Sequence, residues 1–357
     1  MSDNAWLILE NGTIFEGKFF GVKGDVTGEI VFTTGMTGYL ETLTDQSYHG
    51  QIVLQTFPLI GNYGIIPSDF ESAGIGAKAY IVKYPCAEPS NFRSEGNLDA
   101  FFKERGITGL CGIDTRALTK IIRKDGVMNG KICSSPPTDA DLAEAKAYKV
   151  SFPIGKVSSR EASKMGSGGR RIALMDFGVK RGIIESLTSR NCEVWIFPCD
   201  TPAEEILKIK PDGVMLGNGP GDPADPGNVK IIDTITSLDK SGKTIFGICM
   251  GHQLLARTKG HSSRKLKFGH RGSNQPVRET KTGQVYITSQ NHGYEVLVDD
   301  SKTGDNAFVN VNDGTCEGLD YGNSFSVQFH PEARGGPLDT GFLFDRFLER
   351  IDANAAK

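Results

Sequence analysis

The spacing of hydrophobic and polar residues changes character near the middle of the chain. Before residue 150, apolar and polar positions alternate between glycine-containing turns, a period of two that predicts antiparallel strands. The strands expected are Trp6–Leu9, Thr13–Phe20, Glu29–Thr33 and Ile52–Gln55. Helical spacing predicts three helices, at Asn97–Arg105, Thr115–Arg123 and Asp139–Tyr148, with Asp114 as the N-cap of the second. Residues 1–150 therefore predict a β-rich α+β domain.

After residue 170, short apolar runs alternate with helical patterns. Strands are expected at Ile172–Met175, Glu193–Phe197, Gly213–Leu216 and Thr244–Ile248, and helices at Lys180–Arg190, Ala203–Lys208 and Val229–Leu238. This alternation predicts an α/β domain over residues 170–357, with a mostly parallel sheet flanked by helices. Residues 151–169 have few periodic apolar positions and end in a Gly/Ser cluster, so a linker is expected there.

Length and composition exclude several classes of protein. A chain of 357 residues favours two domains, and its net charge of −3, spread along the sequence, offers no basic face for nucleic acid. No run approaches the roughly 18 apolar residues of a membrane span, and the first residues do not resemble a secretory signal. We therefore expect a cytoplasmic location and no contact with a membrane.

Cysteine and histidine spacing argues against disulfides and metals. The seven cysteines are odd in number and contain no C-x-x-C, a pattern typical of free thiols in a reducing compartment. The six histidines lack the spacing of known local ligand motifs. From sequence we therefore expect neither a structural nor a catalytic metal.

The segment Lys243–Leu255 carries the strongest chemical signal. Its Gly247-Ile248-Cys249-Met250-Gly251 is a G-x-C-x-G sequence between an expected strand and a helix, the thiol form of a nucleophile elbow. The flanking glycines let the backbone double back, and the N-terminus of the helix favours negative charge on the sulfur. Cys249 is thus the nucleophile candidate. The alternative is a buried cysteine that only packs.

A glycine-rich loop, Gly217–Pro223, follows the expected strand Gly213–Leu216. Two prolines prevent a helix from opening there at once, which rules out a dinucleotide fingerprint. Either it is a tight surface turn, or its glycines present backbone N–H groups to a ligand or an oxyanion. Gly242-Lys243-Thr244 resembles the end of a phosphate-binding loop, but a strand follows it and Ser237 replaces the first glycine. We therefore expect no phosphate-binding loop here.

Two further segments carry polar chemistry at strand ends. Ser289–Tyr294 follows an expected strand at Val285–Thr288, and Ser326–Glu332 places His330 and Glu332 two residues apart. A thiol nucleophile requires an imidazole to move protons, and the imidazole requires an acceptor that fixes its tautomer. His330 and Glu332 fit these roles, although a single histidine at a strand end is more often structural. Because His330 already fills the base role, packing or loop support is favoured for His252 and His292. The local sequence favours turn formation for Ser47.

The sequences FGICMGHQ, QNHGY and QFHPE, in this order, resemble the class I glutamine amidotransferases. The resemblance covers residues 170–349. The N-terminal half is similar to the first domain of the glutamine-hydrolysing small subunit of carbamoyl-phosphate synthetase, on four segments: Gly12–Gly21, Gly28–Val53, Pro58–Ile65 and Cys111–Lys120. The resemblance implies hydrolysis of L-glutamine to glutamate and ammonia. It also implies a large subunit that receives the ammonia, binds ATP and Mg, and makes carbamoyl phosphate for arginine and pyrimidine synthesis, with no cofactor in this chain.

The same resemblance assigns roles to individual residues. It implies that Cys249 forms a γ-glutamyl thioester, that His330 shuttles the proton and that Glu332 orients His330. The backbone N–H of Met250 and one from the loop at Gly219 would form the oxyanion hole. The residues implied to hold glutamine are Gln253, Ser47, Gly219, Gly221, Asn291, Gly293 and Tyr294. Since Ser47 belongs to the first domain, the resemblance implies a site between the two domains.

One segment departs from the family pattern. Gly269–Pro276 has Arg271 and Gln275 where the family has histidines, which puts a subunit-coupling role of this segment in doubt but not the thioester chemistry. Two other functions remain open on the residues: a stand-alone γ-glutamyl hydrolase or cysteine peptidase, and a catalytically silent regulatory subunit. The first leaves the N-terminal domain unexplained, and the intact set of Cys249, His330 and Glu332 argues against the second.

Overall fold

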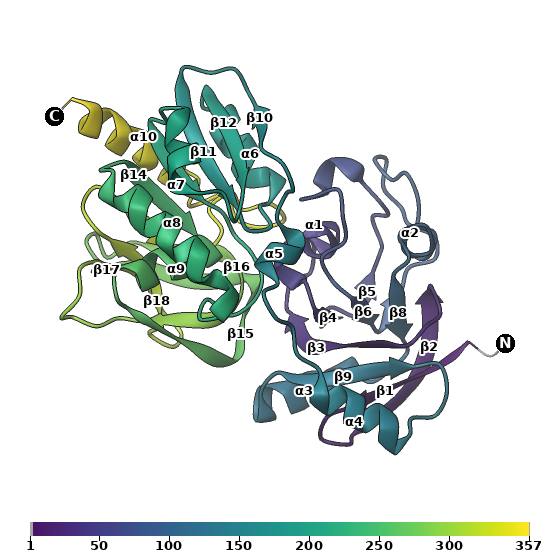
Figure 1. Cartoon of the computed structure of the whole chain (residues 1–357). Helices are drawn as coiled ribbons and strands as arrows, with labels where there is room; N and C mark the ends of the chain where they lie inside the picture. Colours follow the sequence, from purple (N-terminus) through teal and green to yellow (C-terminus); the bar gives the residue numbers. More distant parts are fainter. Residues whose placement is uncertain (1–2, 357) are drawn as a thin grey trace. The chain divides into compact units, whose positions relative to one another are not determined.

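A computed structural model of the chain describes residues 3–356 (Figure 1). Its internal contacts divide the chain into two compact units, Met1–Val150 and Ser151–Lys357, each with its own sheet and hydrophobic core. Among the described residues, no helix is both long enough and apolar enough to cross a lipid bilayer.

The first unit is built on a closed barrel of seven strands in the order β1-β2-β8-β6-β4-β3-β9. The barrel strands are β1 (Asn4–Leu9), β2 (Ile14–Gly21), β3 (Val26–Thr33), β4 (Gln51–Gln55), β6 (Ala79–Val82), β8 (Thr108–Cys111) and β9 (Met128–Cys133). A separate pair joins β5 (Leu59–Ile60) to β7 (Tyr84–Pro85). The four strands expected from alternation are confirmed, and closure leaves the barrel without an exposed edge.

The expectation of an antiparallel sheet is only partly correct. β1 and β2 pair in antiparallel fashion, but β3, β4, β6 and β8 pair with one another in parallel. Parallel neighbours require crossover connections, which the helical segments between these strands supply. The helical segments of this unit are α1 (Tyr39–Thr44), η1 (Gln46–Tyr48), η2 (Pro67–Asp69), α2 (Leu98–Arg105), α3 (Thr115–Asp125) and α4 (Asp139–Ala147). The side chain of Asp114 accepts the N–H of Ala117, so its expected N-cap role is confirmed.

The second unit contains a ten-stranded sheet in the order β10-β12-β11-β13-β14-β19-β18-β16-β15-β17. The five strands β12, β11, β13, β14 and β19 are parallel, and the remainder is antiparallel. The strands are β10 (Ser163–Met165), β11 (Arg170–Asp176), β12 (Cys192–Pro198), β13 (Gly213–Leu216), β14 (Thr244–Ile248), β15 (Ser262–Glu279), β16 (Val285–Leu297), β17 (Asp305–Asn310), β18 (Cys316–Asp320) and β19 (Phe325–Val327). The expected parallel sheet is confirmed at its centre.

Helices cover both faces of the parallel part of this sheet. Alternate residues along β11 point to opposite sides: Leu174 packs with α6 and α10, whereas Met175 packs with α7, α8 and α9. In Figure 1, α8 and α9 run next to each other across one face, in contact with each other. The helical segments of this unit are α5 (Ile154–Val157), α6 (Arg181–Thr188), α7 (Ala203–Lys208), η3 (Pro226–Asn228), α8 (Val229–Lys240), α9 (Met250–Thr258) and α10 (Phe342–Ala355).

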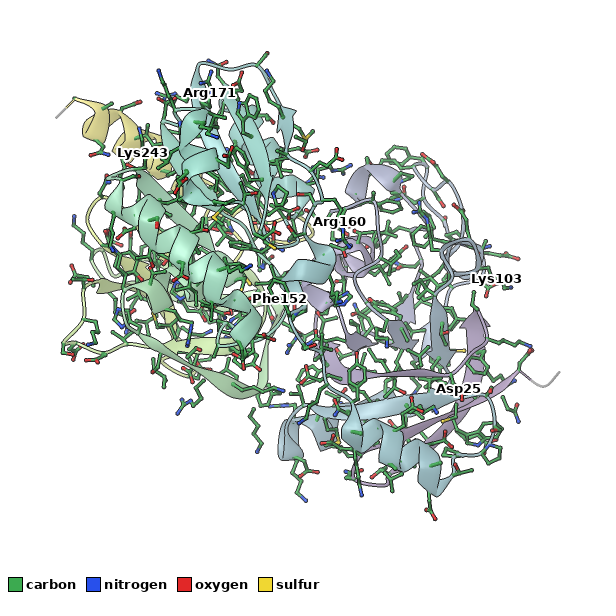
Figure 2. All side chains as sticks on the ribbon, viewed as in Figure 1. Asp25, Lys103, Phe152, Arg160, Arg171 and Lys243 are labelled. Atoms are coloured by element: carbon green, nitrogen blue, oxygen red, sulfur yellow. The ribbon has the colours of Figure 1, made fainter. Side chains whose placement is uncertain are left out.

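The segment 151–169, for which the sequence predicts a linker, has regular structure in the second unit. It contains α5, whose Ile154 is buried in the core, and β10, which pairs with β12. Phe152, labelled in Figure 2, donates its backbone N–H to Asp225 Oδ2 over 2.8 Å. Figure 2 also labels Arg171 and Lys243 along the amino-terminal edge of the parallel strands. Cys249, Gly219 and Gly221 follow the opposite, carboxyl ends of the parallel strands. The segment Ser289–Tyr294, expected to follow a strand at Val285–Thr288, lies instead within the longer strand β16.

Candidate active site

Cys249 occupies a sharp turn between β14 and α9. Its φ is +55° and its ψ −104°, a conformation that costs a residue other than glycine on the order of 1–3 kcal/mol. A Cβ on Gly247 would lie 2.7 Å from the carbonyl oxygen of Gly251, and one on Gly251 would lie 2.3 Å from that of Leu216. The steric reason for the two glycines of the elbow is therefore confirmed.

The backbone and the sulfur of Cys249 are both held in place. Its N–H donates to the carbonyl oxygen of Val327 over 2.9 Å, and its Sγ lies 3.7 Å from the carbonyl oxygen of Asn291. The residue is only 2 % exposed. Cys249 is the N-cap residue of α9, and the first backbone N–H groups of a helix have no partner within it.

His330 and Glu332 meet next to this thiol. The Nδ1 of His330 lies 2.7 Å from Oε1 of Glu332, and the backbone N–H of His330 donates to Ser289 over 2.9 Å. The Nε2 of His330 is buried and has no hydrogen-bond partner among residues 3–356. It remains available to the thiol of Cys249, whose interaction contributes to the raised pKa of His330. The structure thus brings together the three residues expected to carry the chemistry.

The charges in this cluster are strongly coupled. Burial opposes a charge on His330, but the carboxylate of Glu332 and the hydrogen bonds outweigh burial and raise the pKa of His330. Burial likewise opposes a charge on Glu332, but the nearby charges of Lys180 and His330 outweigh it and lower the pKa of that carboxyl group. Near neutral pH the arrangement favours an imidazolium hydrogen-bonded to a carboxylate.

Lys180 is the residue of this cluster that the sequence analysis missed. Its Nζ donates to Oε1 of Glu332 over 3.0 Å, and its backbone N–H donates to Oδ1 of Asn218 over 3.0 Å. The sequence analysis placed Lys180 at the first turn of a helix, where a lysine is ordinarily exposed. The available signal was its position just after the carboxyl end of β11, at the edge where functional groups gather.

Six of the residues expected to hold glutamine belong to the second unit, on α9, on β16 and in the loop after β13. Gln253, on α9, donates its side-chain N–H to the carbonyl oxygen of Tyr294 over 2.9 Å and to Oε1 of Gln328 over 2.9 Å. Asn291, Gly293 and Tyr294 belong to β16, and the carbonyl oxygen of Asn291 lies beside the thiol. Together these contacts fix the start of α9 against β16.

Gly219 and Gly221 lie in the loop after β13, and the structure gives each a steric reason. A Cβ on Gly219 would lie 2.2 Å from the carbonyl oxygen of Phe177, and Gly221 has a φ of +101°. Backbone at both positions can therefore approach other groups more closely than other residues would allow.

Ser47 belongs to the first unit. It lies in η1, and its N–H donates to Oδ1 of Asp45 over 2.9 Å, which is the turn geometry expected on local sequence. Its contribution to a glutamine site, and the location of that site between the domains, stay predictions.

Two other histidines near the elbow are buried. Nδ1 of His252 pairs with Oγ of Ser326 at 2.8 Å, and burial lowers the pKa of His252 to about 3, so the ring is neutral. His292 pairs through Nδ1 with the carbonyl oxygen of Tyr294 at 2.8 Å, and burial lowers its pKa as well. Gly269–Pro276 lies within β15, where Arg271 is buried and donates to the carbonyl oxygen of Phe268.

Comparison with known proteins identifies both units. Residues 7–132 match the family model of the CPSase domain of the carbamoyl-phosphate synthase small chain, and residues 173–350 match that of class-I glutamine amidotransferases. The chain is 49% identical over 358 residues to the carbamoyl phosphate synthase small chain of Fusobacterium nucleatum, covering 98% of this chain and 99% of that protein. It is 50% identical over 355 residues to the small chain of Bacillus caldolyticus, covering 97% and 96%.

A third relative carries a narrower name. The pyrimidine-specific carbamoyl phosphate synthase small chain of Halalkalibacterium halodurans is 48% identical over 359 residues, covering 98% of this chain and 97% of that protein. These matches extend over both units and nearly the full length of each relative. The chain therefore belongs to the family of carbamoyl-phosphate synthase small chains and contains a class I glutamine amidotransferase domain.

Proposed function

We propose that this chain hydrolyses L-glutamine to glutamate and ammonia, and that it passes the ammonia to a large synthetase subunit that forms carbamoyl phosphate. The observation that carries this proposal is the buried elbow cysteine, Cys249, beside the paired His330 and Glu332. Its family supports the partner, because a small chain implies a large one.

The proposed chemistry begins with Cys249 as a thiolate paired with the protonated ring of His330. The sulfur attacks the side-chain amide carbon of glutamine, and the carbonyl oxygen becomes an oxyanion facing the backbone N–H of Met250 and one from the loop at Gly219. His330 gives its Nε2 proton to the leaving nitrogen, so that the C–N bond breaks, ammonia departs and a γ-glutamyl thioester remains. The neutral ring then deprotonates a water molecule, which attacks the thioester carbon and releases glutamate.

The other residues of the site have supporting roles in this proposal. Glu332 holds His330 by its Nδ1, which leaves Nε2 to face the sulfur and the substrate. Gln253, Asn291, Gly293 and Tyr294, with Gly219, Gly221 and Ser47, contact the glutamine. ATP and Mg bind to the large subunit and are not needed for the hydrolysis of glutamine.

The test is release of ammonia and glutamate from glutamine, measured with and without the large subunit. Cys249→Ser should lower the rate by roughly 10³-fold or more, because a hydroxyl is a far weaker nucleophile at neutral pH. Cys86→Ser is the matched control, since Cys86 lies in the first unit, partly exposed. A Cys249→Ser variant that hydrolyses glutamine as fast as the parent would disprove the assignment.

The same assay separates the two other functions. A stand-alone γ-glutamyl hydrolase would cleave γ-glutamyl peptides as well as glutamine, and the large subunit would not change its rate. A silent regulatory subunit would release no ammonia under either condition, although it could still bind the large subunit. The proposed function predicts that the complex hydrolyses glutamine and forms carbamoyl phosphate from the ammonia that this hydrolysis releases.

A further inference from the structure

A second cluster of ligand-type side chains lies where β15, β16 and β18 come together. His270, His292 and Glu317 supply it, one from each strand, and all three are buried. Nδ1 of His270 lies 3.2 Å from Nε2 of His292 and 3.3 Å from Oε1 of Glu317. The proposed hydrolysis of glutamine uses none of these side chains.

The partners of His270 fix the position of its proton. Its Nε2 lies 2.8 Å from Oδ2 of Asp313, and a carboxylate oxygen can only accept a hydrogen bond. Nε2 is therefore the N–H donor, so in the neutral ring Nδ1 carries a lone pair. That lone pair faces His292 and Glu317.

The same reasoning applies to His292. Its Nδ1 lies 2.8 Å from the carbonyl oxygen of Tyr294, which also can only accept, so in the neutral ring Nε2 carries the lone pair. This Nε2 lies 3.0 Å from Oε1 of Gln290. The amide nitrogen of Gln290 donates to Oε2 of Glu317 over 3.0 Å, which fixes Oε1 as the atom facing His292.

With both rings neutral, four acceptor atoms converge with no hydrogen between them: Nδ1 of His270, Nε2 of His292, Oε1 of Glu317 and Oε1 of Gln290. Oε1 of Glu317 also accepts from Nδ2 of Asn310 over 3.2 Å. Such a set requires a positive occupant, either a proton or a metal ion. One proton serves only part of this set. On Nδ1 of His270 it leaves Oε1 of Gln290 facing Nε2 of His292 at 3.0 Å without a donor, and on Nε2 of His292 it leaves Nδ1 of His270 facing Oε1 of Glu317 at 3.3 Å without one. In a tetrahedral zinc site with bonds of about 2.0–2.1 Å, neighbouring ligand atoms are about 3.3 Å apart. The separations of 3.2 and 3.3 Å from Nδ1 of His270 match that spacing, and all three ligand atoms lie within 4.8 Å of one another.

We propose that His270, His292 and Glu317 form a binding site for a divalent transition metal of the zinc type, with Gln290 or a water molecule as the fourth ligand. Two imidazoles with oxygen ligands suit Zn²⁺ and Co²⁺ better than Mg²⁺ or Ca²⁺, which prefer oxygen alone. Each ring donates its other N–H to an oxygen, as metal-bound histidines almost always do. The carboxylates of Glu317 and Asp313 offset the dication, whereas the nearby Arg271 opposes it.

The positions of the three ligands along the chain explain why the spacing of histidines in the sequence did not indicate a metal site. The ligands come from three strands, at positions 270, 292 and 317, so no short motif joins them. The site also borders the elbow: Tyr294 accepts hydrogen bonds through one carbonyl oxygen from both His292 and Gln253. A bound metal would therefore hold in place the segment of β16 that contacts α9.

Metal binding to the full chain tests the proposal directly. The protein is stripped with a chelator and titrated with Zn²⁺ by calorimetry and with Co²⁺ by visible spectroscopy. We expect one equivalent of tight binding and the intense visible bands of tetrahedral Co²⁺, without the near-ultraviolet band of cobalt bound to thiolate. We also expect Zn²⁺ to raise the midpoint of thermal unfolding.

The variants distinguish this site from others on the chain. His270→Gln and Glu317→Gln should each weaken Zn²⁺ binding by at least about 10-fold and abolish the thermal shift. His261→Gln is the control, since His261 pairs with Thr303 outside the cluster and its loss should leave binding unchanged. Absence of stoichiometric binding would mean that a proton alone occupies the cluster. A cobalt–thiolate band, or binding that survives both variants, would place the metal at another site. Any one of these three results would overturn the proposal.

Discussion

Nζ of Lys180 lies 3.0 Å from Oε1 of Glu332, and the two side chains are 8 % and 0 % exposed. The same Oε1 accepts from Nδ1 of His330 over 2.7 Å, so one carboxylate oxygen is held between two cations. These residues follow β11 and β19, on either side of the elbow strand β14 and its neighbour β13. The ion pair therefore fixes the carboxylate that orients His330.

Lys180→Met should weaken both stability and hydrolysis. A hydrogen bond to a charged group contributes about 1.5–3 kcal/mol to stability, and we expect the free energy of unfolding to fall by an amount in that range. The loss should stay below the roughly 3–5 kcal/mol of an uncompensated buried charge, because His330 still neutralises Glu332. Urea unfolding in a Trp6→Phe background measures the loss, since Trp195 then reports on the second unit alone.

Lys208→Met is the control for that measurement. Lys208 pairs with Glu205 on the surface of α7, where both side chains are more than half exposed. An exposed pair contributes less than about 1 kcal/mol. If both lysine variants lost the same amount of unfolding free energy, the pair of Lys180 with Glu332 would contribute no more than an exposed pair.

Glu332→Gln should reduce glutamine hydrolysis by about 10²–10⁴-fold with little change in the fold. The amide keeps the shape of the side chain but cannot stabilise a positive charge on His330 or fix its tautomer as a carboxylate does. The measurement is kcat for ammonia release, with thermal unfolding as a check on folding. A variant with parental kcat would show that His330 is oriented by other contacts.

Much of the fold follows from local patterns. The elements Ala203–Lys208, Gly213–Leu216 and Thr244–Ile248 have the expected bounds because apolar runs and helical spacing there are uninterrupted. The long strand β15 was missed because its residues, SSRKLKFGHRGSNQPVRE, are largely polar and only a third of them are buried. The parallel pairing within the barrel was also missed, since alternation specifies a strand but not its neighbour.

The candidate site likewise contains residues that a local pattern predicts and one residue that it does not. Cys249 carries a local signal, the two glycines of the elbow, and His330 and Glu332 stand together at a strand end. Lys180 reaches Glu332 from 152 positions away in the sequence. No pattern of spacing records such a contact, because it depends on the order of strands in the sheet. The roles given to all these residues remain predictions for the assays above.

The stability contributed by His330 should depend on pH in a defined direction. Burial opposes the charge, but Glu332 and the hydrogen bonds raise the pKa of His330 from 6.5 to about 10 in the folded state. A raised folded-state pKa means that protonated His330 stabilises the fold fully below pH 6.5, and that this contribution is lost as the pH rises toward 10. The difference in unfolding free energy between the parent and His330→Asn should therefore shrink over this range. A difference that grows with pH would contradict the raised pKa.

The glycine at the start of α9 should tolerate no larger side chain. A Cβ on Gly251 would lie 2.3 Å from the carbonyl oxygen of Leu216, so Gly251→Ala must push α9 away from β13. Overpacking of this kind costs about 1–3 kcal/mol or more, and it also displaces Cys249 from His330, so hydrolysis should fall with stability. Gly341→Ala is the control, because its nearest neighbour would be the carbonyl oxygen of Leu338 at an ordinary 3.7 Å. Thermal unfolding and ammonia release, measured on both variants, check the prediction. If Gly251→Ala kept the parental unfolding midpoint and the parental rate of ammonia release, the elbow would be able to relax without moving its sulfur.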